Sequence, residues 1–145
     1  MTHLDVFFGS RTGTAKELAS DLANKASKRG VVVLLKEMNE FDPTHFDDDE
    51  LDSYYSPSRA TVFVVSTHYA GPAPNAEMFV QWLRFNLNWR HLFRNKRKKA
   101  FARLQYAVFG VGNSTYLTYN AMGKLIDARL HALGATRLCP LGLGD

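Results

Sequence analysis

The sequence predicts an α/β domain built on a parallel sheet with helices on both faces. Short runs rich in Val, Phe and Leu alternate along the chain with longer segments of helical period. These runs are almost continuously apolar, which is typical of strands covered on both faces. Gly30 and Gly134 follow two helical segments, where a left-handed residue commonly ends a helix. This alternation predicts one domain over residues 1–145.

The apolar runs give the predicted strands, which are residues 4–8, 31–35, 61–66, 106–110 and 136–141. Helices are expected over residues 14–28, 76–89 and 119–133. In the first and third of these helices, apolar residues recur every four positions and predict the face turned to the sheet. These residues are Leu18, Leu22 and Ala26 in the first helix, and Met122, Ile126 and Leu130 in the third.

The segment 35–60 is less regular, and a helix start is expected near Pro43. No helix follows the last predicted strand, although one would cover the sheet beside the first helix. We therefore expect a fragment of a larger multidomain protein.

Composition narrows the possible functions. Hydrophobic residues make up 46% of the chain and charged residues 22%, as in ordinary globular domains. The single cysteine, Cys139, excludes an internal disulfide and a Cys-rich metal or iron–sulfur site. No apolar run approaches the roughly 18 residues of a membrane span, and Asp5 interrupts the first apolar run, unlike a signal peptide. The expected compartment is the cytoplasm.

The chain has a net charge of +4, and its charged residues are unevenly distributed along the sequence. Seven basic residues and no acid lie between Arg90 and Arg103. Such a block can bind nucleic acid, a phosphate-rich cofactor or an acidic protein, or be a solvated loop. An acidic cluster lies at residues 47–50, and carboxylates in the first turn of a helix explain it more simply than a metal site does. No metal site is expected.

Ligands of parallel α/β sheets bind beyond the carboxyl ends of the strands, so the loops at those ends are the candidates for chemistry. The first loop, residues 9–15, offers three hydroxyl groups, a turn glycine and the backbone N–H groups of a helix start. These groups attract an anion. The spacing is neither that of a P-loop nor that of a dinucleotide-binding loop. A helix capped by Ser10 or Thr12 is the alternative.

The other two loops offer rings and amides. In the second loop, residues 66–75, His68 and Tyr69 could stack on a planar ligand, or pack on the protein in a rigid Pro/Gly connection. In the third, residues 110–120, glycines allow close backbone approach, Asn113 and Asn120 supply amides, and Tyr116 offers a second stacking face. Together, the three loops predict a flat cofactor with a monophosphate tail.

Residues 8–15 resemble the FMN phosphate loop of flavodoxins and diflavin reductases. Residues 109–116, 120–124, 133–135 and 141–145 look like the FMN domain of NADPH–cytochrome reductases. The resemblance implies a flavodoxin-like, five-stranded parallel sheet of order 2-1-3-4-5, with FMN as cofactor. It implies no catalytic residue. The residues it places at FMN are Ser10, Arg11, Thr12, Gly13, Thr14, Ala15, Thr67, His68, Tyr69, Gly71, Gly110, Val111, Gly112, Asn113, Tyr116, Asn120 and Asp145.

The sequence departs from this family pattern in three places. Arg11 replaces the usual glutamine of the phosphate loop. In the second loop His68 takes the place of the aromatic residue and Tyr69 that of a glycine, and the stretch 72–74 is shorter and lacks acid. The connection 85–104 is longer and more basic than in cytochrome reductases.

These features favour an FMN-binding electron-transfer domain of a diflavin-reductase-type, NADPH-dependent oxidoreductase. An FAD/NADPH reductase module, on the same or a separate chain, would donate electrons, and the acceptor protein is left open. A first alternative is the flavodoxin module of a wybutosine-synthesis enzyme, which the sequence also resembles, with tRNA near the basic block. A second is a flavin-free interaction module.

Overall fold

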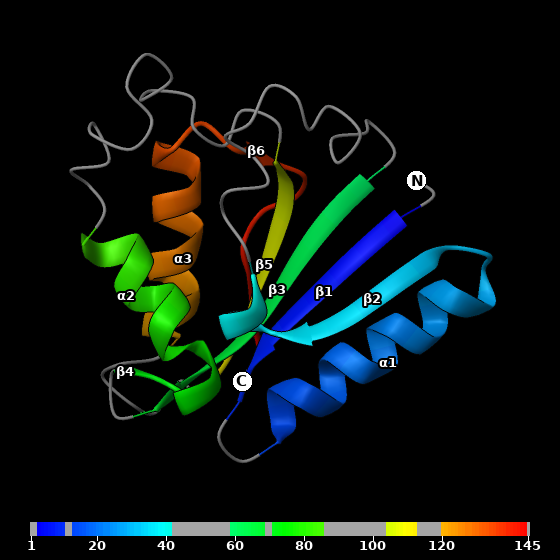
Figure 1. The fold of residues 1–145 in the computed structure, drawn as a ribbon, viewed down its shortest axis with the longest axis horizontal. Coiled ribbons are helices and arrows are strands. Elements are labelled where there is room, and N and C mark those ends of the chain that lie inside the picture. Colours follow the sequence, from blue (N-terminus) through cyan, green and yellow to red (C-terminus); the bar gives the residue numbers. More distant parts are fainter. Residues whose placement is uncertain are drawn as a thin grey trace.

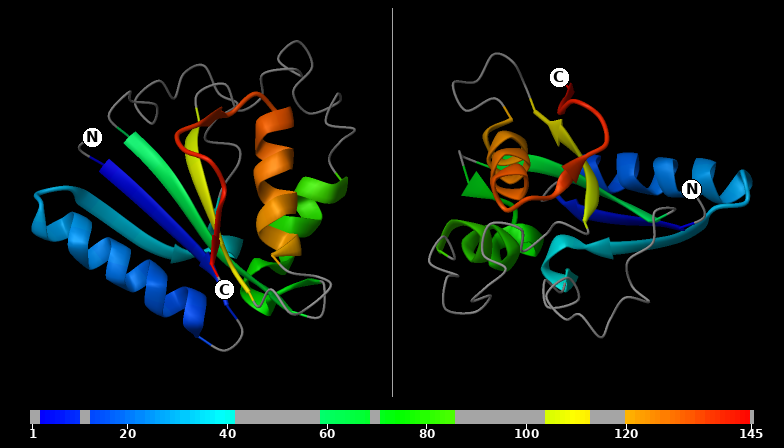
Figure 2. Two further views of the ribbon diagram at one scale, coloured as in Figure 1. Left: turned by 180° about the vertical axis from the view of Figure 1, so that it is seen from behind. Right: turned by 90° about the horizontal axis from the view of Figure 1, so that it is seen from above.

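A computed structural model describes residues 3–10, 13–41, 59–68, 71–85, 104–112 and 120–144. It has a central sheet with helices on both faces (Figure 1). One apolar cluster joins helix α1 (Thr14–Lys28) to one face of the sheet, and a second, larger one joins α2 (Glu77–Phe85) and α3 (Ala121–Ala132) to the other face. Figure 2 shows the twisted sheet between these helices from behind and from above. The predicted α/β class is confirmed.

The sheet has the strand order β2-β1-β3-β5-β6, and these strands are all parallel. This confirms the predicted order 2-1-3-4-5. The two-residue strand β4 adds an antiparallel pair to the end of β3, and β7 pairs in parallel with β5. The bounds are β1 His3–Gly9, β2 Val32–Glu37, β3 Arg59–His68, β4 Gly71–Pro72, β5 Gln105–Val111, β6 Thr136–Arg137 and β7 Gly142–Gly144.

The last predicted strand, 136–141, is wrong as a continuous element. The chain pairs with β5 at β6, leaves the ladder, and returns to β5 at β7. Leu138 still donates its N–H to the carbonyl of Tyr106 at 2.8 Å. Pro140 follows, and a proline cannot donate to a ladder. The chain therefore pairs with β5 at β6 and again at β7, but residues 138–141 between them are not strand.

The helices agree with the prediction in place and differ in detail. Helix α1 spans Thr14–Lys28, α2 spans Glu77–Phe85, and α3 spans Ala121–Ala132. In the described part of the chain there are also two short 3-10 helices, η1 Met38–Glu40 and η4 Pro74–Ala76, and η4 directly precedes α2. The predicted helix start near Pro43, the acidic cluster 47–50 and the basic block 90–103 lie outside the described residues.

The face of α1 that meets the sheet is one position away from the predicted stripe. Ala15, Ala19 and Ala23 are its buried residues. Leu18, which the pattern places on the core side, is 42% exposed. The small alanines allow the helix backbone to approach the sheet closely, and the leucine row lies at the margin of that contact. In α3 the predicted stripe is confirmed, because Met122, Ile126 and Leu130 are fully buried.

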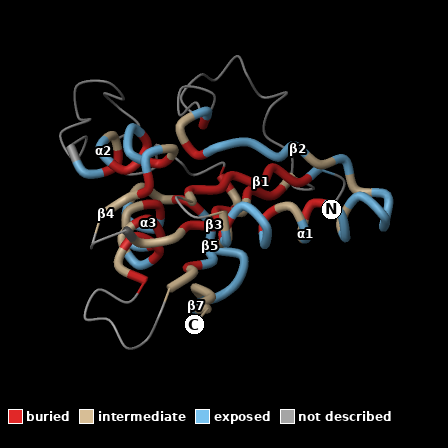
Figure 3. The backbone as a smooth tube through the Cα atoms, turned by 90° about the horizontal axis from the view of Figure 1, so that it is seen from below, coloured by how far each residue is buried: buried red, intermediate tan, exposed pale blue. Residues whose placement is uncertain are grey.

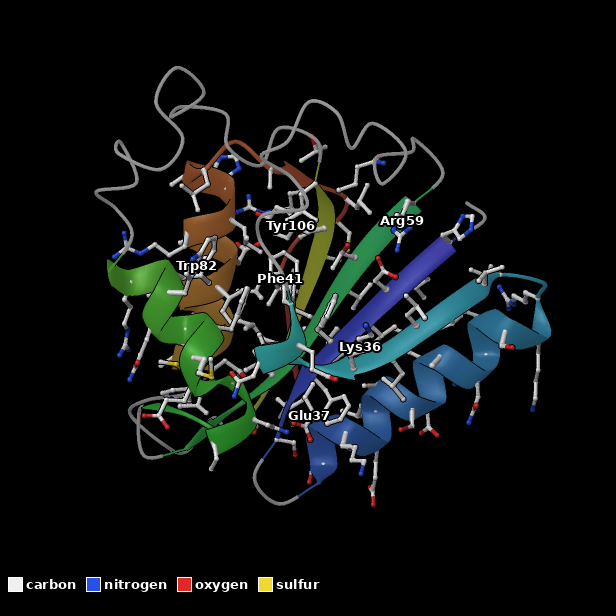
Figure 4. All side chains as sticks on the ribbon, in the orientation of Figure 1. Lys36, Glu37, Phe41, Arg59, Trp82 and Tyr106 are labelled. Carbon is white, nitrogen blue, oxygen red and sulfur yellow. The ribbon has the colours of Figure 1, made fainter. Side chains whose placement is uncertain are left out.

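Burial is greatest in the middle of the sheet. Figure 3 shows β1 as buried and β2, at the sheet edge, as largely exposed. The sequence predicts strands that are covered on both faces, but this is wrong for β2, where Val32 is 58% exposed. On the face of the sheet away from α1, the rings of Phe7, Phe41, Phe63 and Phe79 pack with centroids between 5.1 and 5.8 Å. Phe41 is labelled in Figure 4. No helix in the described part of the chain is both long and apolar enough to cross a membrane.

Candidate cofactor site

The three loops meet because β1, β3 and β5 are neighbours that end level with one another. Gly9 at the end of β1 pairs with Val65, and Val65 pairs with Gly110 on β5. The chain therefore leaves the sheet at one edge after each of these strands. The predicted clustering of the three loops holds for the residues that the structure describes.

The first loop is closed by a serine. The Ser10 Oγ accepts a hydrogen bond from the Gly13 N–H at 2.8 Å, and Gly13 has a φ of 96°. The first helical bond of α1 runs from the Glu17 N–H to the Gly13 carbonyl, so the amides of residues 14–16 precede it. A hydroxyl that accepts one bond can still donate its own proton. The hydroxyl, the first-turn amides and the helix dipole together suit an anion.

Two side chains outside the first loop hold it in place, Ser66 of β3 and Asn75 of η4. The Ser66 Oγ donates to the Gly9 carbonyl at 3.2 Å, and the Asn75 Oδ1 accepts from the Ser10 N–H at 2.9 Å. A Cβ on Gly9 would lie 2.6 Å from the Cβ of Ala76, so glycine is required for η4 to approach. Neither Ser66 nor Asn75 is a site residue that the sequence predicts. Asn75 lies just before a helix, a position that suggests local capping rather than a bond to a distant loop.

The second loop is joined to the start of α3. Thr67 and His68 pair with Pro72 and Gly71, so the chain reverses direction between β3 and β4. The Thr67 Oγ1 accepts a hydrogen bond from the Met122 N–H at 3.1 Å. Thr67, which the resemblance places at the cofactor, thus satisfies an amide in the first turn of α3 while keeping a proton to donate.

The third loop is built around Asn120, a residue in the left-handed conformation with a φ of 53°. Its Nδ2 donates to the Gly144 carbonyl at 3.2 Å, and the Gly112 N–H donates to the same carbonyl at 3.2 Å. The Asn120 side chain packs against Gly110, where an added Cβ would lie 2.7 Å from Oδ1. This contact explains the glycine at the end of β5.

Among the described residues, the Asn120 Oδ1 is a buried acceptor without a hydrogen-bond partner. A buried polar atom left in this state costs about 1–3 kcal/mol. Such an atom calls for an explanation, for example a bound group that supplies the missing donor. Its position beside Gly110 places this acceptor at the edge where the loops meet.

The predicted site residues divide into two sets. The structure brings together Ser10, Gly13, Thr14, Ala15, Thr67, Gly71, Gly110, Val111, Gly112 and Asn120 around the carboxyl ends of β1, β3 and β5. The remaining ones, which are Arg11, Thr12, the side chain of His68, Tyr69, Asn113, Tyr116 and Asp145, lie outside the described residues.

The pKa values of Tyr106 and Arg137 are shifted, and both residues lie near the amino ends of the strands, away from the three loops. Burial, together with the nearby Asp127 carboxylate, raises the pKa of the Tyr106 phenol. The hydrogen bond to Asp127 raises the pKa of Arg137, whose guanidinium contacts that carboxylate at 2.7 and 2.9 Å. Both groups belong to a structural network that joins β5, α3 and β6.

The described groups fit a flat cofactor with a monophosphate tail. The first loop offers hydroxyl and amide donors rather than a lysine and a magnesium ligand set, and the third offers an unpaired acceptor beside a glycine. Within the ranges that the structure describes, no three His, Cys, Asp or Glu side chains are grouped as a metal site. We find no contradiction between these residues and the predicted cofactor.

Comparisons with known proteins agree with this architecture. The profile of the family described as Flavodoxin matches residues 6–145. The chain is 39% identical over 142 residues to the NADPH–cytochrome P450 reductases of Sus scrofa and Homo sapiens, and 40% identical over 144 residues to that of Musca domestica. These alignments cover 97% or 98% of this chain but only 19% of each relative.

Solved structures support the fold. A flavodoxin of Streptococcus pneumonia superimposes with a TM-score of 0.69 at 21% identity, covering 99% of this chain and 85% of that one. A mutant flavodoxin from Pseudomonas aeruginosa gives a TM-score of 0.66 at 22% identity, covering 99% and 84% of the two chains. At these identities the likeness concerns the fold alone.

Proposed function

This chain belongs to the flavodoxin family, and we propose that it binds one FMN at the carboxyl edge of its sheet and relays electrons one at a time. FMN is the cofactor of this family. The observation that carries the proposal is the first loop, where Ser10 closes onto Gly13 at the start of α1. Bound FMN supplies the chemistry, because it takes up two electrons and can release them singly.

The protein's own residues would bind and orient the cofactor. We propose that the Ser10 hydroxyl, the Thr12 and Thr14 hydroxyls and the first amides of α1 hold the phosphate. Gly110 and Gly112 would allow the backbone to approach the ring, and the Asn120 Oδ1 would accept a hydrogen bond there. The spare donors of the first loop and the unpartnered acceptor of the third support this division of roles.

The electron donor is proposed from the relatives. The curated relatives are NADPH–cytochrome P450 reductases, and this chain spans about a fifth of their length. We propose that electrons from NADPH reach this domain through an FAD-containing reductase module, on the same or on a separate chain. The acceptor would be another protein.

Comparing FMN with riboflavin tests the proposal, because only FMN carries the phosphate. The purified protein should bind FMN, show flavin absorption and bind riboflavin much more weakly. Replacing Thr12 and Thr14 together with Ala should weaken FMN binding at least about tenfold, since each lost hydrogen bond to a charged acceptor is worth about 1.5–3 kcal/mol. Fluorescence titration of the apoprotein measures both affinities. Equal affinity for FMN and riboflavin would contradict the phosphate site.

A further inference from the structure

We propose that Asn75 is a positioning residue for the phosphate loop and sets the preference for FMN over riboflavin. The role rests on the proposed function, because it concerns the same anion site. Asn75 belongs to η4, not to the first loop, and it meets that loop only through the fold. The inference follows from how Ser10 is held, from how η4 is fixed, and from the neutral charge of the asparagine amide.

Ser10 is held at two points. Its N–H donates to the Asn75 Oδ1 at 2.9 Å, across a separation of 65 residues, and its Oγ accepts from the Gly13 N–H at 2.8 Å. The first bond fixes the backbone of Ser10, and the second fixes its side-chain rotamer. The hydroxyl proton then remains as the donor that Ser10 can offer to an anion. Without Asn75, the loop keeps its local turn but loses the bond from η4.

The acceptor on Asn75 is itself rigidly mounted. Pro74 opens η4 with a fixed φ, and the fully buried Ala76 packs against Gly9. From the other side, the Asn39 Nδ2 donates to the Pro74 carbonyl at 3.1 Å. The Asn39 Oδ1 accepts from the N–H groups of Met78 and Phe79 at 3.0 and 3.3 Å, which ties η4 and the start of α2 to η1. Asn75 is thus held on the scaffold and not on the loop that it orients.

The neutral amide of Asn75 matters for the kind of ligand. A carboxylate at this position would accept the Ser10 N–H equally well, but it would bring a negative charge to a loop that we propose binds a phosphate. Charges of like sign at short range repel, and salt screens the repulsion. Asparagine therefore combines the hydrogen-bond acceptor with the absence of charge that an anion site requires.

Two substitutions of Asn75 and one control variant distinguish a role of Asn75 in positioning the first loop from a general loss of stability around η4. We compare Asn75→Ala, which removes the acceptor, with Asn75→Asp, which keeps the acceptor and adds charge. Asn39→Ala is the control, since it removes three hydrogen bonds to the same region but none to the first loop. Each protein is titrated with FMN and with riboflavin, and the exchange of the Ser10 amide hydrogen is followed by NMR in the apoprotein.

Asn75→Ala should lower FMN affinity about tenfold while riboflavin affinity changes less than about twofold, and the Ser10 amide should exchange faster. Asn75→Asp should lower FMN affinity at least as much, with the loss shrinking as salt is added, while the Ser10 amide stays protected. Asn39→Ala should lower the unfolding midpoint at least as far as Asn75→Ala, but it should change the ratio of the two affinities less, because the bond from the Ser10 N–H to Asn75 remains.

Three outcomes overturn the assignment. If Asn75→Ala leaves the ratio of FMN to riboflavin affinity unchanged in a protein that prefers FMN, Asn75 has no such role although the proposed function stands. If Asn39→Ala changes the ratio equally, the effect is general loosening. A wild-type protein that does not prefer FMN removes the phosphate site itself, and with it the role of Asn75.

Discussion

Polar side chains are bonded differently at the two ends of the parallel strands. We call the end where these strands begin the amino edge of the sheet, and the end where they finish, with the three loops, the carboxyl edge. At the amino edge, Asp5 is 2% exposed and receives two hydrogen bonds from Arg59, at 2.8 and 3.1 Å. Arg137 likewise donates two hydrogen bonds to Asp127, whose carbonyl accepts a bond from the buried Tyr106. Arg59 and Tyr106 are labelled in Figure 4. At the carboxyl edge, the described contacts are single, neutral hydrogen bonds: Ser10, Ser66 and Asn120 each donate one, and Thr67 accepts one.

The difference separates stability from binding. Paired charges at the amino edge satisfy each other and leave little for a ligand, and removing one partner strands a buried charge. Hydroxyl and amide groups at the carboxyl edge keep a spare donor or acceptor after their structural bond is made. We therefore expect substitutions at the amino edge to change the free energy of unfolding and those at the carboxyl edge to change cofactor affinity as well.

The largest expected effect comes from Arg59→Ala. It leaves the Asp5 carboxylate without its guanidinium partner inside the sheet, and breaking a buried pair from one side costs about 3 kcal/mol. Urea unfolding should show this loss, with the FMN affinity of the folded protein unchanged. Arg29→Ala is the matched control, an exposed arginine whose loss should cost less than about 0.5 kcal/mol. A large fall in FMN affinity for Arg59→Ala would contradict the expectation that substitutions at the amino edge change only the stability of the protein.

Gly110→Ala should come next, at about 2 kcal/mol, because the added methyl group overpacks the third loop. The new Cβ would meet the buried Asn120 side chain at 2.7 Å, and this side chain is tied to Gly144. FMN affinity should fall together with stability. Gly142→Ala is the control, since its Cβ meets the ring of Phe109, which is 47% exposed and free to turn. Equal losses of stability and affinity in the two variants would contradict this account of Asn120.

The smallest effect is expected for Tyr106→Phe, which removes the bond from the phenol to the Asp127 carbonyl. The loss should be about 1 kcal/mol at neutral pH, with FMN affinity unchanged. Because the folded state raises the pKa of Tyr106, the unfolded chain loses this proton first as pH rises. The wild type should therefore lose stability above about pH 10 more steeply than Tyr106→Phe. Parallel curves of unfolding free energy against pH for the two proteins would refute this sign.

Sequence patterns predicted the fold well because they reflect local and periodic properties. Continuous apolar runs gave four strands at nearly their observed positions, and the stripe of Met122, Ile126 and Leu130 is the buried face of α3. Periodicity alone did not distinguish the leucine row of α1 from the alanine row beside it, because small side chains give a weaker apolar signal than leucine. It also did not detect the break in the last strand, where the run stays apolar around Pro140.

The site was predictable only where its chemistry is local. A loop of hydroxyls and glycine before a helix indicates an anion site by itself, and the resemblance supplied the residues around it. The supporting bonds were missed because they join distant segments. Asn75 meets Ser10 across 65 residues, and Thr67 meets Met122 across 55. Nothing in the local sequence of either partner indicates the other.

The carbonyl of Gly144 connects β7 with the third loop. It accepts from both Gly112 and Asn120, so these two described residues of the third loop are joined through Gly144 when β7 pairs beside β5. Among the described residues β7 has three residues and pairs with β5 alone, and short strands of this kind are expected to open locally before the fold as a whole unfolds. A ligand that binds only the closed form suppresses this opening. If the cofactor binds at this loop as proposed, cofactor binding and the pairing of β7 with β5 should therefore stabilise each other.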